Sequence, residues 1–87
     1  MPRYELRIAR SAEKEFAAIP TKDRDRFTMK ISQLVHQPRP HGVEKLAGTH
    51  GYYRIRQGDW RVVYQIDDAQ GLVVITKVGH RREVYRS

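Results

Sequence analysis

The fold is decided by residues 53–64, YRIRQGDWRVVY, in which two runs of strand-forming residues flank Gly58-Asp59. Aromatic and β-branched residues favour strands, and a glycine at the first central position suits a two-residue hairpin turn. A turn of this length sets the register, so each residue before it has a predicted partner after it. The predicted pairs are Gln57 with Trp60, Arg56 with Arg61, Ile55 with Val62, Arg54 with Val63, and Tyr53 with Tyr64.

Alternation along this hairpin sorts its side chains onto two faces. Arg54, Arg56 and Arg61 share one face, and the other, which we expect to lie under helices, carries Tyr53, Ile55, Val62 and Tyr64. Like charges that face each other across strands cost roughly 0.2 to 1 kcal/mol, so an arginine row is a poor choice for stability alone. A phosphate arriving at that face removes the repulsion. The hairpin therefore predicts an anion-binding surface; the alternative is three solvated arginines.

The residues before the hairpin predict a strand and two helices. Residues 3–8 alternate as in a half-buried strand. We expect a first helix N-capped by Ser11 and ended by Pro20, and a second N-capped by Thr21, with Asp23 in its first turn. The buried stripe of the second helix is predicted to be Phe27, Ile31, Leu34 and Val35. The proline-rich stretch 37–42 ends that helix.

The residues from 52 onward predict a three-stranded antiparallel meander. Its strands are expected at 52–56, 60–66 and 72–78, and the last is apolar enough to be central and covered on both faces. The order of elements predicts an α+β fold with the helices on one face of the sheet, as one domain over residues 1–87. If residues 67–71 close so that Ile66 faces Leu72, Arg61 lies opposite Lys77 and Arg81 continues on the same side.

The composition indicates a small basic globular protein. The 87 residues carry 17 Lys and Arg against 10 Asp and Glu, a net charge of +7, and 12 of the cations are arginine. Arginine makes forked contacts with phosphate, so this excess points to nucleic acid or to an acidic protein partner. The chain has no cysteine, which excludes disulfides and thiolate metal sites. We expect a cytoplasmic protein, because no stretch resembles a signal peptide or a transmembrane helix.

The C-terminal segment 80–87, HRREVYRS, holds further candidates. Tyr85 can stack on a base or move a proton, and Arg81 can hold developing phosphate charge. Lys77, His80 and Arg82 are secondary candidates; His80 is the tail residue whose ordinary pKa suits proton transfer near neutrality. The other histidines lack ligand spacing and there is no acidic cluster, so we expect no metal site and no cofactor.

Several pieces of the chain, taken together and in order, resemble the RelE/ParE superfamily of toxins from toxin–antitoxin pairs. They are the opening strand, the helical hairpin closed by Pro38, residues 45–48 (KLAG), 53–56 (YRIR), 58–64 (GDWRVVY) and 78–86 (VGHRREVYR). The resemblance implies a RelE-like fold and, for the RelE branch, cleavage of mRNA in the ribosomal A site. There the ribose 2′-hydroxyl attacks the adjacent phosphate, the bond from phosphorus to the 5′-oxygen breaks, and a cyclic phosphate and a free 5′-hydroxyl are left.

The family's catalytic residues fall on Arg54, Arg56, Arg61, Arg81 and Tyr85. The resemblance implies that Arg56 and Arg61 stabilise the phosphorane, Arg81 holds the phosphate in line, and Tyr85 orients the nucleophile or exchanges its proton. Arg54 and Arg56 stand where some relatives carry lysine, and because a guanidinium cannot readily lose a proton, Arg54 is a poor general base. An acidic, RelB-like antitoxin is the implied partner, with the toxin monomeric alone and oligomeric in its complex.

Two other functions remain open from the sequence. ParE-like members of the superfamily inhibit DNA gyrase and cleave no RNA, although such an inhibitor has no need of the arginine set and Tyr85. A non-enzymatic basic module would bind RNA or DNA in a salt-sensitive way without producing cleavage products.

Overall fold

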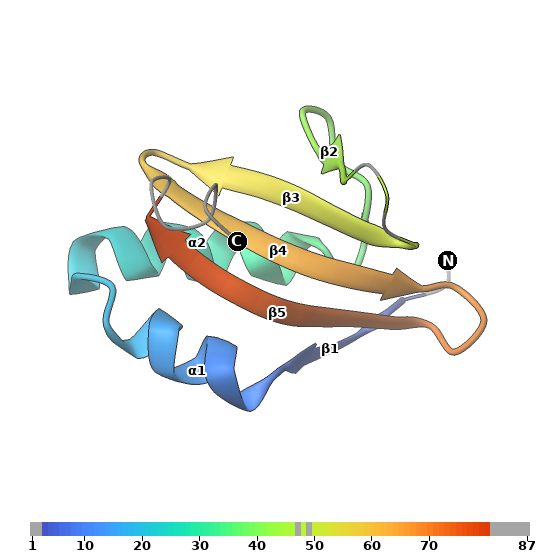
Figure 1. Cartoon of the computed structure of the whole chain (residues 1–87), viewed down its shortest axis with the longest axis horizontal. Coiled ribbons are helices and arrows are strands. Elements are labelled where there is room, and N and C mark those ends of the chain that lie inside the picture. Colours follow the sequence, from blue (N-terminus) through green and yellow to red (C-terminus); the bar gives the residue numbers. More distant parts are fainter. Residues whose placement is uncertain (1–2, 47, 49, 81–87) are drawn as a thin grey trace.

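The computed structural model of the protein describes residues 3–46, 48 and 50–80, which form a five-stranded sheet with two helices packed on one face (Figure 1). The elements in chain order are β1 (Glu5–Ile8), α1 (Arg10–Ala17), α2 (Thr21–Gln33), β2 (Glu44–Lys45), β3 (Tyr52–Gln57), β4 (Trp60–Asp67) and β5 (Leu72–His80). Across the sheet the order is β1-β5-β4-β3-β2, with β1 parallel to β5 and all other neighbours antiparallel. The predicted α+β class, the meander and the central place of β5 are confirmed.

The hairpin between β3 and β4 has the predicted register at every position. Arg56 pairs with Arg61, Arg54 with Val63, and Tyr53 with Tyr64. Gly58 adopts φ +63°, the left-handed conformation that a two-residue turn of this kind needs at its first central position. The turn chemistry and the alternation agree, so local sequence is sufficient to determine which side chains share a face.

The β4–β5 register differs from the expectation. Leu72 pairs with Asp67 rather than with Ile66, and a bulge between Val63 and Tyr64 shifts the pairing by a further residue. Arg61 therefore lies opposite Gly79, not opposite Lys77. Each one-residue shift exchanges the faces of a strand, and the two shifts together restore them beyond the bulge. Lys77, which pairs with Val63, consequently lies on the arginine side of the sheet as predicted.

Both helices begin earlier than predicted, α1 by two residues and α2 by one. α1 begins at Arg10, directly after the strand, because the Ala9 amide bonds to Ile75 of the sheet while the Ala9 carbonyl accepts from Glu13. Ser11 is thus inside the helix and not its cap. α2 begins at Thr21, preceded by Pro20, and Asp23 lies in its first turn as expected.

The core lies between the helices and one face of the sheet. α1 packs along β5, and α2 packs on the same face of the sheet with contacts to β3 (Figure 1). Val35, predicted for the buried stripe of the second helix, comes after α2 and is only half-buried. The largest fully buried side chains come from α2, the residue after it, β4 and β5: Tyr64, Phe27, Leu34, Ile75, Val62, Val73 and Val78. The outward residues of β5 are half-buried, so the prediction that this strand is covered on both faces is met only in part. Of the helices in the described ranges, none has the length and apolar character needed to cross a membrane.

Candidate nucleic-acid interface

The sheet face turned away from the helices carries the arginines of the hairpin. Arg54 and Arg56 lie two residues apart on β3, and Arg56 faces Arg61 of β4, so the three share this side. We call these residues the arginine face. Their neighbours Tyr53, Ile55 and Val62 are buried in the core on the opposite side of the same strands.

The three arginines share a face but differ in exposure. Arg56 is exposed, whereas Arg61 is only 4% exposed and donates from Nη1 to the carbonyls of Gly58 at 3.1 Å and Trp60 at 3.0 Å. These bonds hold its guanidinium against the turn. The side chain of Arg54 is 15% exposed and forms an ion pair with Glu44, its cross-strand neighbour on β2, at 3.1 Å. The predicted arginine row thus consists of one exposed cation, Arg56, beside two whose guanidinium groups are held by the protein itself, which differs from the alternative of three solvated arginines.

Lys77 extends the same side of the sheet toward α1. Its Nζ lies 3.3 Å from Oε2 of Glu15, and the other oxygen of that carboxylate accepts the Val78 amide at 2.8 Å. β1 pairs with β5 only as far as Ile75, so Glu15 satisfies an amide that the short neighbouring strand leaves uncovered. Glu15 thereby fixes Lys77 and protects the sheet edge.

His80 lies on the other side of the sheet from the arginines. It pairs with Trp60, and the two rings meet edge to face at a centroid distance of 5.7 Å. The Trp60 ring in turn lies edge to face with the Phe27 ring of α2, at a centroid distance of 6.4 Å. The structure thus does not bring His80 together with Arg54, Arg56 and Arg61. Arg81, Arg82 and Tyr85 lie outside the described residues.

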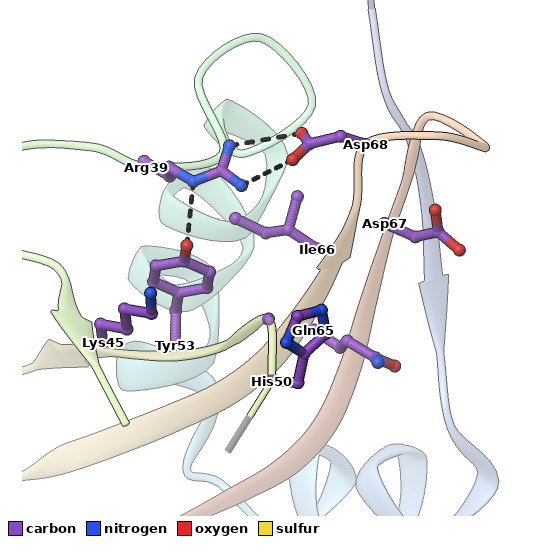
Figure 2. A pocket seen from close by; sticks show the side chains of 9 residues that line it. Arg39, Lys45, His50, Tyr53, Gln65, Ile66, Asp67 and Asp68 are labelled. Atoms are coloured by element: carbon purple, nitrogen blue, oxygen red, sulfur yellow. Dashed lines mark hydrogen bonds and ion pairs between the residues drawn. The ribbon is translucent and has the colours of Figure 1, made fainter. Parts of the chain in front are cut away.

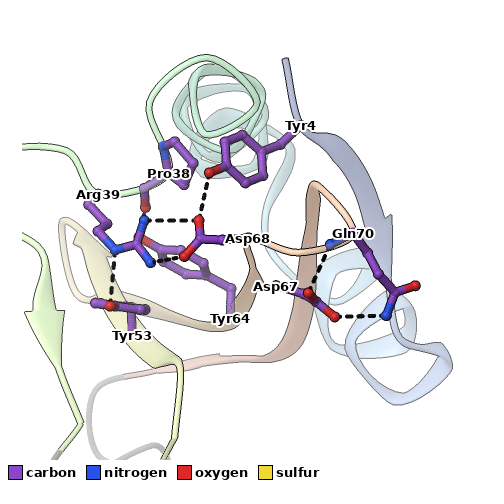
Figure 3. Close-up of polar contacts among 8 residues, drawn as sticks. All are labelled: Tyr4, Pro38, Arg39, Tyr53, Tyr64, Asp67, Asp68 and Gln70. Atoms are coloured by element: carbon purple, nitrogen blue, oxygen red, sulfur yellow. Dashed lines mark hydrogen bonds and ion pairs between the residues drawn. The ribbon is translucent and has the colours of Figure 1, made fainter. Parts of the chain in front are cut away.

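A polar cluster at the opposite end of the hairpin was not predicted. Arg39 makes a two-pronged contact with Asp68 at 2.8 and 3.3 Å and donates from Nε to the Tyr53 hydroxyl at 3.0 Å (Figure 3). The Tyr4 hydroxyl donates to the same Asp68 carboxylate at 2.6 Å. Arg39 thereby lowers the pKa of Asp68, and the hydrogen bond to Asp68 raises the pKa of Tyr4. We call these four residues the Arg39 cluster.

The Arg39 cluster joins segments that are distant in sequence. It borders a cleft of about 440 Å³ whose wall also includes Lys45, His50 and Gln65 (Figure 2). Beside it, the hydroxyl of the buried Tyr64 donates to the Pro38 carbonyl at 2.6 Å. The sequence signal that could have pointed here is residues 38–40, Pro-Arg-Pro, which indicated only a helix end.

Comparison with known proteins identifies the family. A sequence model described as "ParE toxin of type II toxin-antitoxin system, parDE" matches residues 6–85, which is nearly the whole chain. The chain belongs to this family. The resemblance to the RelE/ParE superfamily predicted from the sequence is thereby confirmed.

Solved structures of RelE toxins are similar to this ParE-family chain over almost its full length. The archaeal RelE–RelB complex from Pyrococcus horikoshii OT3 matches with a TM-score of 0.81 and 30% identity, covering 93% of this chain and 97% of that one. The isolated RelE toxin of E. coli matches with a TM-score of 0.80 and 30% identity, covering 95% and 92%.

A curated relative matches over a shorter region. Toxin RelG of Mycobacterium tuberculosis (strain ATCC 25618 / H37Rv) is 45% identical over 42 residues, which are 48% of this chain and 45% of that protein. The matched region thus spans less than half of the relative's length. The family model is described as ParE, whereas these relatives carry names of the RelE type, so the names alone do not assign a target to this chain.

Proposed function

We propose that this ParE-family chain is a toxin of the RelE type, an endoribonuclease that cuts mRNA in the ribosomal A site without a metal ion or cofactor. The observation that carries the proposal is the arginine face. The hairpin register places Arg54, Arg56 and Arg61 on one side of the sheet, with Lys77 nearby on the same side. Several cations directed at one surface suit a reaction that gathers negative charge on a phosphate.

Each described arginine has a distinct proposed role. Arg61, fixed by two backbone carbonyls, is positioned before substrate arrives and stabilises the phosphorane. Arg56 is exposed, makes the first contact with the phosphate and then stabilises the phosphorane together with Arg61. Arg54 exchanges its contact with Glu44 for a contact with the RNA, since a phosphate oxygen is an equivalent acceptor. From the resemblance, Arg81 holds the scissile phosphate in line and Tyr85 handles a proton.

The proposed partner is an acidic antitoxin of the RelB type. Relatives of the same fold have been crystallised as toxin–antitoxin complexes, among them the intact E. coli RelBE complex, with a TM-score of 0.80 and 28% identity. A chain with a net charge of +7 offers such a partner strong electrostatic complementarity. We propose that the antitoxin covers the arginine face, that the toxin alone is a monomer, and that both act in the cytoplasm.

Arg56→Ala tests the nuclease directly, because its exposed side chain can be removed without disturbing the core. Loss of one charge-stabilising group typically costs about 100-fold or more in rate, so we expect growth arrest and message cutting to be largely lost. Arg7→Ala is the matched control, since it is an exposed strand arginine on β1 that pairs with Glu5. Mapping of RNA 5′ ends within minutes of induction provides the readout. Unchanged cutting by the Arg56 variant would refute the site.

The family description favours a second candidate, inhibition of DNA gyrase by a ParE-like toxin. That function predicts blocked supercoiling by purified gyrase and damaged DNA in cells while messages stay intact. The same induced cultures distinguish the two candidates, because RNA ends and DNA breaks can be mapped from one sample.

A further inference from the structure

The outer side of α2 carries a second row of cations, separate from the arginine face. Lys22, Arg26 and Lys30 follow one another at four-residue intervals and therefore lie along one stripe of the helix. Lys22 and Arg26 are exposed, whereas Lys30, three residues after the buried Phe27, is half-buried at the edge of the stripe. At a rise of 1.5 Å per residue, the three positions span about 12 Å. We call these residues the α2 stripe.

Among the residues that the structure describes, no carboxylate forms an ion pair with the α2 stripe. The ion pairs recorded within the described ranges engage Arg7, Arg39, Arg54 and Lys77 instead. Asp23 and Asp25 belong to the same helix, but in that part of the chain neither is paired with a stripe residue. Like charges four residues apart repel each other on a helix, and Asp23 and Asp25, three residues from Arg26 and Lys22, offset only part of that repulsion. A bound row of phosphates removes that repulsion.

The groups beside the α2 stripe fit a nucleic-acid backbone better than a free anion. A hollow of about 320 Å³ lies there, lined by Arg26, Met29, Lys30, Gln33 and Gln57. Met29 is 66% exposed, an unusual position for a large apolar side chain, and its flexible thioether can pack against a sugar or base. The two glutamine amides can donate to phosphate or sugar oxygens. Cations, amides and one apolar contact together match the chemistry of a ribose-phosphate chain.

The α2 stripe and the arginine face cannot serve one short RNA segment. α2 packs on the core side of the sheet (Figure 1). Arg56 lies on the opposite side, as its pairing with Arg61 shows. A message strand cut at the arginine face leaves the α2 stripe open for other phosphates. We propose that the α2 stripe binds the phosphate backbone of a structured RNA and anchors the toxin while it acts on the message. This inference rests on the proposed function, in which the structured RNA is that of the ribosome.

Replacing all three cations tests the anchor. The variant carries Lys22→Gln, Arg26→Gln and Lys30→Gln. Its binding to ribosomes is measured by fluorescence anisotropy of the labelled toxin between 50 and 200 mM KCl. Over this range the affinity of a protein that makes six phosphate contacts falls by about 10³-fold. The ribosomes carry a message with a 2′-deoxy sugar at the cut position, so that cleavage does not perturb binding. Each phosphate contact contributes about 1 to the slope of log Kd against log salt, so we expect the slope to fall by about 3. A slope lower by 3 shrinks the difference between variant and wild type about 60-fold from 50 to 200 mM, so the dissociation constant should rise by about 100-fold or more at the lowest salt.

The matched control removes the same charge elsewhere. The control carries three substitutions at exposed cations of β1 and α1: Arg7→Gln, Arg10→Gln and Lys14→Gln. It should leave binding and cleavage near the wild-type values. Circular dichroism checks that both variants are folded, and Arg26→Glu alone serves as a milder second variant that should also weaken binding.

Three results would overturn the anchor: equal losses in both triple variants, an unchanged salt slope in the α2 variant, or weakening only of the complex with an acidic antitoxin. If the wild-type toxin does not bind ribosomes but inhibits gyrase, the proposed function itself is wrong.

Discussion

Replacing Tyr64 by phenylalanine removes one hydroxyl from the interior of the protein. That hydroxyl donates to the carbonyl of Pro38 at 2.6 Å, and both residues are buried (Figure 3). A buried hydrogen bond contributes about 0.5 to 1.5 kcal/mol, and an acceptor left without its donor costs about 1 to 3 kcal/mol. We therefore expect Tyr64→Phe to lower the free energy of unfolding by about 2 kcal/mol. In a domain of this size the melting temperature should fall by about 8 to 16 °C.

Urea denaturation, followed by circular dichroism, measures this loss. Tyr52→Phe is the matched control: it removes the same atom from the same hairpin, on the opposite face, where the described part of the structure records no hydrogen bond to it. The control should stay within about 0.5 kcal/mol of wild type, as expected for a substitution that removes no buried contact. If both variants lose the same stability, the bond between Tyr64 and Pro38 does not hold the connection after α2 against the sheet.

Three further predictions concern pH and the backbone. Burial raises the pKa of Tyr64, so its contribution to stability is present below about pH 10 and is lost as the pH rises; Tyr64→Phe should reduce the alkaline loss seen in melting curves. Arg39 lowers the pKa of Asp68, so that contribution is present above about pH 4 and disappears on further acidification; acid titration of Asp68→Asn should show a shallower loss. Gly51→Ala should cost about 1 to 3 kcal/mol in urea denaturation, because φ is +74° and the added Cβ would lie 3.1 Å from the Ile66 carbonyl, whereas Gly42→Ala, also at positive φ but in open space, should cost less.

The contact between Arg54 and Glu44 bears on how the proposed site is controlled. Glu44 belongs to a two-residue strand at the edge of the sheet, so little structure has to move for its carboxylate to release the guanidinium. In the proposed function, an incoming phosphate would compete directly with Glu44 for Arg54. The contact with Glu44 would then hold Arg54 in place until RNA replaces it.

The sequence by itself determined the hairpin and the side on which its arginines lie. Gly58 and the alternation of residues 53–64 are local signals: the turn sets the register over a few residues, and period-two alternation then assigns every side chain to a face. The same reasoning applies to α2, where the spacing of Phe27, Ile31 and Leu34 predicts the buried stripe that the structure contains.

Tertiary structure alone decided what required contacts between distant segments. The parallel pairing of β1 with β5, the bulge beside Val63 and the ion pair of Glu44 with Arg54 depend on residues that meet only after the chain has folded. Arg61 reads in the sequence as an exposed cation, and only the folded chain shows it buried against the hairpin turn. The physical reason is that periodicity and turn chemistry act over a few residues, whereas burial and charge pairing are set by whichever neighbours the fold brings into contact.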